Sequence, residues 1–446
     1  MNQTKPGKFR KDLIYPAVIS LLLPAPFLLG STVLLNYLDM YYYLKLADTI
    51  QDGELAPFLS TSGFRTAAFP LLLHWSLGLF GRSLLALKYL ETVCLALICL
   101  QSWAIGRLLM KNNSGLLAAI LVCTSYTFAH FLYFPHLDMP LLVLMNLGLL
   151  VLAVACKGEN PETKWLILSG LAIGATCLFK ETAILLLIVF PSWSLLHRTF
   201  LLSTTLWRWT LQLLSAGVVL VPVLIGRSAH LMVFAEKIYR ESFAPSGAGP
   251  HSLDVSLVRL VTYPLYPVYW QWQDLLPVPT TLIAVEHVFL LATAACYVFV
   301  SPAPANAKRF LLAILIAFLP LYVYVTIQGY KIRQLLMMVF VLYLTSAFAV
   351  WWLAEVVGKR CLKVVLDPRW RRTVVWAGLG SLYTIRLVVF LAAFDHTMSS
   401  AHPLKFHRSN PLPAHQSHFL EPKAAEVVSR ISDSHKWVLS TGFSFD

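Results

Sequence analysis

The chain has 446 residues, of which 58% are hydrophobic and 13% are charged. This balance excludes a water-soluble globular protein and indicates a membrane protein with many spans. The net charge of +13 comes largely from Lys and Arg in short loops between apolar runs, so it reports topology and affinity for anionic lipid headgroups. Nucleic acid is not an expected partner.

Apolar runs that are long enough to cross the hydrocarbon core recur along the whole chain. They predict an all-α, polytopic membrane fold of about eleven transmembrane helices. The approximate ranges of the runs are 13–35, 83–108, 115–134, 140–156, 165–179, 182–199, 207–229, 280–300, 310–327, 332–357 and 374–394.

Lys and Arg gather before the first run and in alternate short loops. By the positive-inside rule, these loops and the N-terminus lie in the cytoplasm. We therefore expect a multi-pass protein of a bacterial or archaeal plasma membrane, with its active site on the outer side. The transmembrane domain covers 1–394, with a first outer loop at 36–82 and a long outer loop at 230–280. An outer tail covers 395–446, and its ending "KWVLSTGFSFD" reads like the first strand of a soluble domain.

The first outer loop opens with "NYLDMYYYLKLAD". At helical pitch, Asp39 shares one face with Tyr43, Leu46 and Ile50, and the other charged residues of the segment take the opposite face. Asp39 therefore points toward membrane or protein, where a charge is costly and indicates function. The alternative is a carboxylate that caps a helix N-terminus. The second half of the loop, "FRTAAFPLLLHWSLGLF", is also amphipathic, so we expect interfacial helices in this loop.

Two further outer turns carry ionisable residues beside apolar spans. Asp138 stands in "HLDMP", where it either belongs to a functional site or N-caps the span that begins near Pro140. Lys180 and Glu181 interrupt the apolar sequence "CLFKETAILLL". They are either site residues or a structural ion pair at a tight turn, and the sequence leaves these alternatives open.

Lys331 and Arg333 stand at the outer mouth of a late span, in "GYKIRQLLMMVFVLYL". This position runs against the positive-inside trend. Two adjacent cations suit an anionic headgroup or a phosphate. The alternative is a pair of anchors whose long side chains extend to the interface.

The order and common side of these motifs resemble the GT-C superfamily of integral membrane glycosyltransferases. The resemblance is closer to the branch of protein O-mannosyltransferases and lipid A aminoarabinose transferases, and it covers the span pattern through about residue 394. The motifs are the acidic residue after the first span, "FRTAAFPLLLHW" with Arg65, "HLDMP", "LFKET" and "KIRQLLMMVFVLYL". Protein mannosyltransferases usually have Asp-Glu at the first site, whereas Met40 follows Asp39 here, so the acceptor of that branch is not carried over.

The resemblance implies inverting transfer of a hexosyl or pentosyl unit from a polyprenyl-phosphate carrier to a lipid, glycan or protein acceptor. Asp39 takes the place of the general base and Asp138 is a second catalytic candidate, while cations stabilise the leaving phosphate. The sequence specifies no cofactor and leaves the participation of a divalent metal open. Candidates for the donor phosphate are Lys331, Arg333, Lys180 and Arg65, and candidates for the acceptor or the groove are Tyr42, Tyr43, His136 and Glu181.

A transporter or channel is the main alternative class. It would place ionisable residues within spans and pair them across helices. Lys88, Glu91 and Arg386 are the candidates for such a role. A non-enzymatic membrane scaffold is the third class, and the charged outer loops argue against it.

Overall fold

A computed structural model of the protein describes residues 6–29, 43–44, 46–47, 50, 68–81, 84–110, 112–132, 136–158, 161–197, 202–226, 280–301, 304–328, 335–361 and 368–400. All the regular elements in these ranges are helices. The predicted all-α class is therefore confirmed.

Most helices follow the predicted apolar runs with shifts of a few residues at their ends. In chain order the helices are α1 (Pro6–Leu22), η1 (Ala25–Leu29), α4 (Ala68–Phe80), α5 (Leu84–Met110), α6 (Ser114–Cys123), α7 (Tyr126–Ala129), η2 (His130–Leu132), α8 (Asp138–Ala155), α9 (Thr163–Cys177), η3 (Glu181–Ile188), α10 (Val189–Leu196), α11 (Leu202–Gly226), α15 (Thr280–Phe299), α16 (Ala305–Gln328), α17 (Leu336–Cys361) and α18 (Pro368–Ser400). The first run, 13–35, differs more: α1 begins at Pro6 and ends at Leu22, η1 follows it, and residues 30–35 lie outside the described part of the chain.

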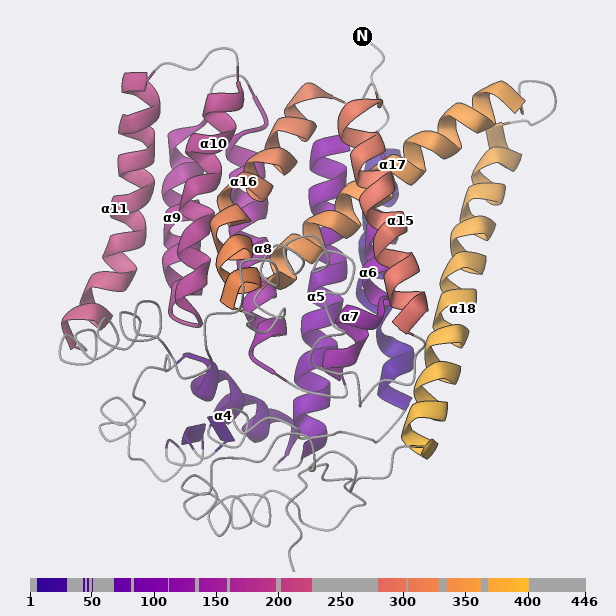
Figure 1. Ribbon diagram of the computed structural model, residues 1–446, viewed down its shortest axis with the longest axis horizontal. Helices are drawn as coiled ribbons and strands as arrows, with labels where there is room; N and C mark the ends of the chain where they lie inside the picture. The colour runs from indigo at the N-terminus through magenta and orange to yellow at the C-terminus, as the bar shows by residue number, and fades with distance from the viewer. Residues whose placement is uncertain are drawn as a thin grey trace, which may run out of the picture.

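The long helices form a bundle with two opposite ends (Figure 1). The N-terminus lies at the upper end in this view, and α4 lies at the lower end. Arg107 stands in the last turn of α5, and Lys164 and Lys308 stand in the first turns of α9 and α16. All three helix ends are at the upper end of the bundle, so these basic residues share one side, as the positive-charge pattern predicts.

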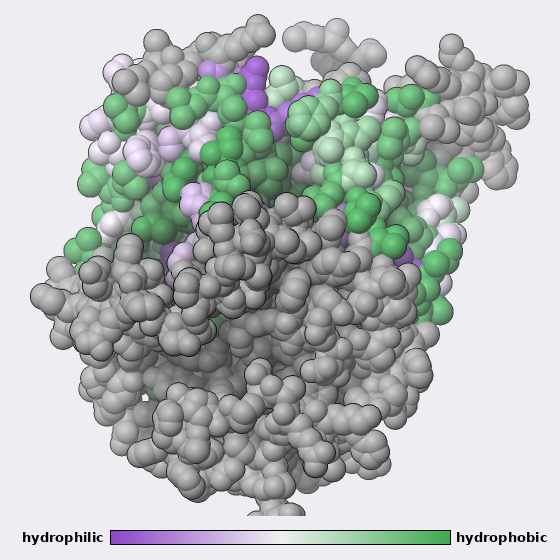
Figure 2. Space-filling view, viewed as in Figure 1, coloured by the Kyte–Doolittle hydropathy of each residue, from purple (hydrophilic) through white to green (hydrophobic). Residues whose placement is uncertain are grey.

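Four helices of the described part are long and apolar enough to cross a membrane. Figure 2 shows apolar side chains over the described middle of the bundle and hydrophilic ones at its upper edge. The protein is therefore an integral membrane protein, and the number of about eleven spans stays a prediction. The four segments are Ala86–Met110, Asp138–Ala155, Ala305–Val325 and Leu336–Val356.

The third predicted run, 115–134, breaks after α6. Thr124 caps this helix, with its N–H donating to the Ile120 carbonyl at 3.0 Å and its hydroxyl donating to the same oxygen at 2.7 Å. The Ser125 hydroxyl accepts the N–H of Phe128 at 3.1 Å, at the start of α7. Ser and Thr side chains compete for backbone groups in this way and interrupt helices. The result is a buried polar turn within an apolar run.

Glycine allows two helix pairs to approach closely. In α9, Gly170 and Gly174 face α11, and a Cβ at Gly170 would lie 2.3 Å from the Gln212 carbonyl oxygen. A Cβ at Gly106 of α5 would lie 2.4 Å from the Cα of Gly115 in α6. In a membrane, burying apolar surface between helices gives no gain over contact with lipid. Small residues stabilise helix pairs there because they let the backbones pack closely. The α5–α6 and α9–α11 pairs therefore form a close-packed frame on either side of α8.

The last described helix, α18, runs to Ser400. The predicted domain boundary at residue 394 thus falls within a helix, and the division into domains stays a prediction. The Tyr383 hydroxyl of α18 donates to the Leu23 carbonyl at 2.5 Å, which ties this helix to the first helical segment of the chain.

Candidate active site

Asp138 is the first residue of α8, at the lower end of the bundle, and its side chain is only 1% exposed. One carboxylate oxygen, Oδ2, lies 2.7 Å from Nδ1 of His136. The other, Oδ1, accepts a hydrogen bond from Nζ of Lys180 at 3.2 Å. Pairing of this kind offsets the cost of burying a charge. Three residues that the sequence singled out from two separate turns therefore meet at one point.

The turn before α8 is held from a neighbouring helix. Its residue His136 is 1% exposed, and its backbone N–H donates to Oε1 of Glu91 in α5 at 2.8 Å. Glu91 is also 1% exposed and interacts electrostatically with Asp138. We call Asp138, His136, Lys180 and Glu91 the Asp138 cluster.

Lys180 reaches this point because α9 ends just before it. The helix ends at Cys177, and Lys180 has an extended backbone and precedes η3. Its amide still donates to the Thr176 carbonyl at 3.3 Å. The side chain then crosses to the start of α8 and stays 16% exposed. The end of α9 thus fixes the backbone of Lys180, while part of its side chain stays accessible to solvent.

Two alternative interpretations of these turns are wrong. The N-cap of α8 is Leu137, and no side chain caps this helix, so Asp138 lies inside the first turn and is not the cap. Lys180 makes its ion pair with Asp138, while Glu181 is exposed at the start of η3. Instead of the alternative Lys180–Glu181 pair, the structure therefore has a pair between separate helices.

Tyr43 packs against α4. It is 6% exposed, and its ring meets that of Phe69 edge to face at a centroid distance of 4.9 Å. Leu46 and Ile50 are buried as well, as are Leu44 and Ala47. This agrees with the predicted burial of Tyr43, Leu46 and Ile50, while the charged residues of the opposite face lie outside the described part. Five predicted site residues lie outside the described part of the chain, and their roles stay predictions: Asp39, Tyr42, Arg65, Lys331 and Arg333.

Sequence reasoning missed the part that Glu91 plays in this cluster. The sequence offers Glu91 and Lys88 as candidates for the transporter alternative, because both are ionisable residues near the start of a predicted span. In the structure, Glu91 contacts the Asp138 turn, and Lys88 is fully buried one helical turn before it. Their spacing of three in an apolar helix marks one shared face. This spacing does not predict which turn elsewhere in the chain the shared face contacts.

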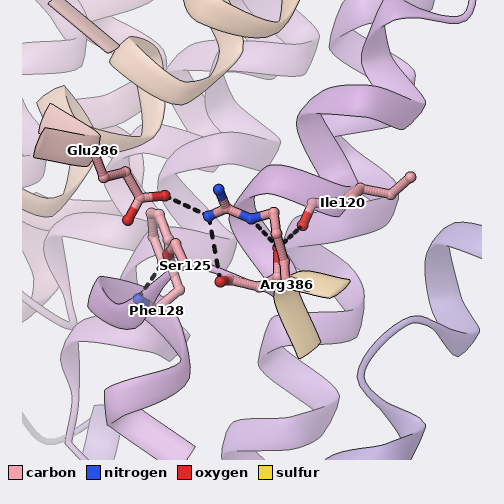
Figure 3. A network of polar contacts seen from close by, with 6 residues as sticks. Ile120, Ser125, Phe128, Glu286 and Arg386 are labelled. Atoms are coloured by element: carbon pink, nitrogen blue, oxygen red, sulfur yellow. Dashed lines mark hydrogen bonds and ion pairs between the residues drawn. The ribbon is translucent and has the colours of Figure 1, made fainter. Parts of the chain in front are cut away.

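Arg386, the third transporter candidate, lies in a separate network. From the middle of α18 its guanidinium pairs with Glu286 of α15, and its Nε donates to the Thr124 hydroxyl at 2.8 Å. Figure 3 shows Arg386 between Glu286 and the turn that follows α6. The side chains of Arg386 and Glu286 are 25% and 13% exposed. We call Arg386, Glu286 and Thr124 the Arg386 network.

The Asp138 cluster combines two acids, a cation and an imidazole in a buried setting. A carboxylate so placed can orient a hydroxyl group or accept its proton, and a lysine can bind an anionic leaving group. No group of three or more His, Cys, Asp or Glu side chains in the described ranges is placed to hold a metal ion. The carboxylates, the imidazole and the ammonium group of the cluster can act in acid–base and electrostatic roles.

Residues 65–228 match the family described as "Dolichyl-phosphate-mannose-protein mannosyltransferase". A comparison with curated protein sequences gave no significant match. The matched segment contains the whole Asp138 cluster. It excludes Asp39 and most of the Arg386 network.

Two solved structures are similar in fold. The archaeal oligosaccharyltransferase AglB from Archaeoglobus fulgidus, in complex with an inhibitory peptide and a dolichol-phosphate, has a TM-score of 0.56 and 12% identity over 86% of this chain. ArnT from Cupriavidus metallidurans, bound to undecaprenyl phosphate, has a TM-score of 0.52 and 14% identity over 96% of this chain. The chain spans 55% of the length of the first and 70% of the second. These likenesses and the family match confirm the predicted resemblance to the GT-C superfamily of integral membrane glycosyltransferases, in the branch of the protein mannosyltransferases and ArnT.

Proposed function

We propose that the protein transfers a sugar from a polyprenyl-phosphate-linked donor to a lipid, glycan or protein acceptor, with inversion, at the outer face of the plasma membrane of a bacterium or archaeon. The observation that carries this proposal is the Asp138 cluster. It places a buried carboxylate and a partly exposed lysine together at the end of the bundle opposite the basic loops. The family match over 65–228 contains the cluster, and the two solved structures of similar fold hold dolichol-phosphate and undecaprenyl phosphate.

The reaction assigns one task to each kind of residue. Asp39 takes the proton of the acceptor hydroxyl or amine, whose lone pair forms the new bond to the anomeric carbon. The bond from that carbon to the phosphate oxygen breaks, and the polyprenyl phosphate leaves with the electron pair. Attack opposite the leaving group inverts the anomeric configuration. Lys331 and Arg333 stabilise the charge that grows on the phosphate.

Asp138 and Lys180 serve the same step. Asp138 positions the acceptor, because its carboxylate is fixed by two partners and cannot rotate freely. Lys180 is a further donor-phosphate candidate, since part of its side chain stays exposed while the Asp138 contact fixes its direction. Fixed groups of this kind lower the barrier by holding reactants in position.

Transport is the second candidate function, because the Arg386 network has the cross-helix pairing that a transporter would use. A single paired arginine also serves as a tether for α18, and it needs no bound substrate. The two functions differ in their product. Only a transferase forms a new glycosidic bond and releases free polyprenyl phosphate.

The test is a transfer assay with purified protein in lipid nanodiscs. A panel of polyprenyl-phosphate hexoses and pentoses is supplied with membrane extracts as acceptors, and released polyprenyl phosphate and glycosylated product are measured by mass spectrometry. Asp39→Asn should lower the rate at least about a hundredfold, the lower end of what a general base contributes. Glu355→Gln is the matched control, because Glu355 is an exposed acid near the upper end of α17 that accepts a hydrogen bond from Trp351. Absence of any covalent product over the whole panel would refute the proposal.

A further inference from the structure

Glu91 is a buried acid that the proposed reaction does not yet use. Its Oε1 accepts the backbone N–H of His136, a residue 45 positions later in the chain, at 2.8 Å. Its Oε2 is buried and has no hydrogen-bond partner within the described part of the chain. An apolar residue would fill this place in a transmembrane helix without the cost of desolvating a carboxyl group. The desolvation cost of this carboxyl group indicates that Glu91 has a structural or functional role.

The hydrogen bond fixes the turn from which the cluster is built. His136 is outside α8 and has no helical partner for its amide, so Glu91 supplies the acceptor that this buried N–H needs. The imidazole of the same residue contacts Asp138, and Asp138 pairs with Lys180. Glu91 therefore stands at the head of a chain of contacts from α5 through α8 to the end of α9.

Loss of the acceptor would disturb this chain at its first link. A buried amide without a partner is unfavourable, and the turn can satisfy it only by moving toward water or another acceptor. Asp138 lies two residues further along the same backbone, so it moves with the turn. A displacement of about 1 Å at a reacting group can cost a hundredfold in rate.

We propose that Glu91 is a positioning residue of the sugar-transfer site, acting through its hydrogen bond to the His136 backbone. This inference rests on the proposed function. Its essential property is the acceptor oxygen and not the negative charge. Glu91→Gln keeps such an oxygen, whereas Glu91→Met keeps the length of the side chain and removes the acceptor.

Gln101 provides a matched control on the same pair of helices. It stands in α5, and its Nε2 donates to the Val143 carbonyl of α8 at 2.8 Å. Gln101→Met removes one buried α5–α8 hydrogen bond and leaves the turn at residues 136–138 untouched. It therefore measures the effect of weaker helix packing alone.

Two measurements test the inference in purified protein. The first is kcat and KM for sugar transfer: Glu91→Met should lose at least about tenfold in kcat, and Glu91→Gln and Gln101→Met should stay within about threefold of the wild type. The second needs no activity. Lys180 is labelled with a water-soluble amine reagent and analysed by mass spectrometry, and its labelling rate should rise in Glu91→Met and stay at the wild-type rate in the other two variants.

The outcomes separate the inference from the function beneath it. A wild type that transfers no sugar, with the expected labelling pattern, refutes the proposed function and supports the positioning role. Equal losses in Glu91→Met and Gln101→Met would overturn the inference in favour of packing, and equal losses in Glu91→Met and Glu91→Gln would overturn it in favour of the charge. If Glu91→Met does not fold, Glu91→Ala replaces it with the same expected results.

Discussion

The Asp138 cluster and the Arg386 network are both partly or fully buried ionic groups, but they are built from different parts of helices. The Asp138 cluster is assembled at helix ends, where α8 starts and α9 stops. Arg386 stands in the middle of α18, and the exposed fractions of its side chain and that of Glu286 are 25% and 13%. Helix ends leave backbone groups without intrahelical partners, which a ligand can satisfy. The backbone groups in the middle of a helix are already paired.

The two groups also differ in how their hydrogen-bonding capacity is used. Arg386 contacts Glu286 through one nitrogen and the Thr124 hydroxyl through another, so its guanidinium joins α18 to α15 and to the turn after α6. In the Asp138 cluster, one buried Glu91 oxygen has no hydrogen-bond partner in the described part, and Asp138 is more deeply buried than Glu286. This difference supports the proposal that the Arg386 network joins helices and that the Asp138 cluster serves a substrate site.

Among the three ion pairs, the largest effect is expected from a change at Lys180. Lys180→Met removes the cation from a carboxylate that is 1% exposed, and kcat should fall by about tenfold or more because a charge at the reacting centre is no longer balanced. The measurement is the initial rate of transfer at saturating donor. Lys164→Met is the control, since this exposed lysine pairs with Glu162 far from the cluster. Equal rates for Lys180→Met and the control would remove Lys180 from the site.

A smaller effect, on stability alone, is expected in the Arg386 network. Arg386→Met leaves Glu286 without its cation and should lower the free energy of unfolding by about 1–3 kcal/mol, a value reduced because both side chains are partly exposed. The double variant Arg386→Met/Glu286→Gln should lose less than the single one, since no charge is left unpaired. Thermal unfolding in detergent measures both. A folded single variant that no longer transfers sugar would show that the network belongs to the reaction.

The smallest effect is expected at the exposed pair of Lys164 and Glu162, whose side chains are 73% and 57% exposed. The hydrogen bond from Lys164 lowers the pKa of Glu162. The small stabilisation is therefore present above the ordinary pKa of a glutamate and is lost as the pH falls through the lowered value. Lys164→Met should shift Tm by less than about 1 °C at neutral pH. A larger shift would mean that exposure does not rank the three ion pairs.

Much of the fold was predictable because a membrane imposes a simple pattern on sequence. Most long apolar runs gave helices close to their predicted bounds, and the burial of Tyr43, Leu46 and Ile50 agrees with the face predicted from helical pitch. The break after Cys123 was not predicted, because the capping by Thr124 and Ser125 leaves the run apolar on average. Local hydrogen bonds of two small polar residues do not alter hydropathy.

The candidate site was predictable only in its members and not in its pairing. Asp138, His136 and Lys180 stood out as polar residues at the outer ends of apolar runs. The sequence leaves open whether Lys180 pairs with its neighbour Glu181 or belongs to a site, and in the structure it pairs with Asp138 across two helices. The contact of Glu91 with the turn before α8 was not predictable for the same reason. The pairing of helices depends on close approaches such as those at Gly106 and Gly170. A single sequence does not predict which helix each glycine will contact.

The central claim is that the Asp138 cluster serves sugar transfer and the Arg386 network does not. The most direct test compares the transfer rates of two purified, folded variants, Asp138→Asn and Arg386→Met/Glu286→Gln. Both replace charge with neutral side chains of similar size. The account predicts that Asp138→Asn loses at least about tenfold in kcat/KM and that the double variant stays within about twofold of the wild type. Equal rates in the two variants, or the reverse order, would contradict it.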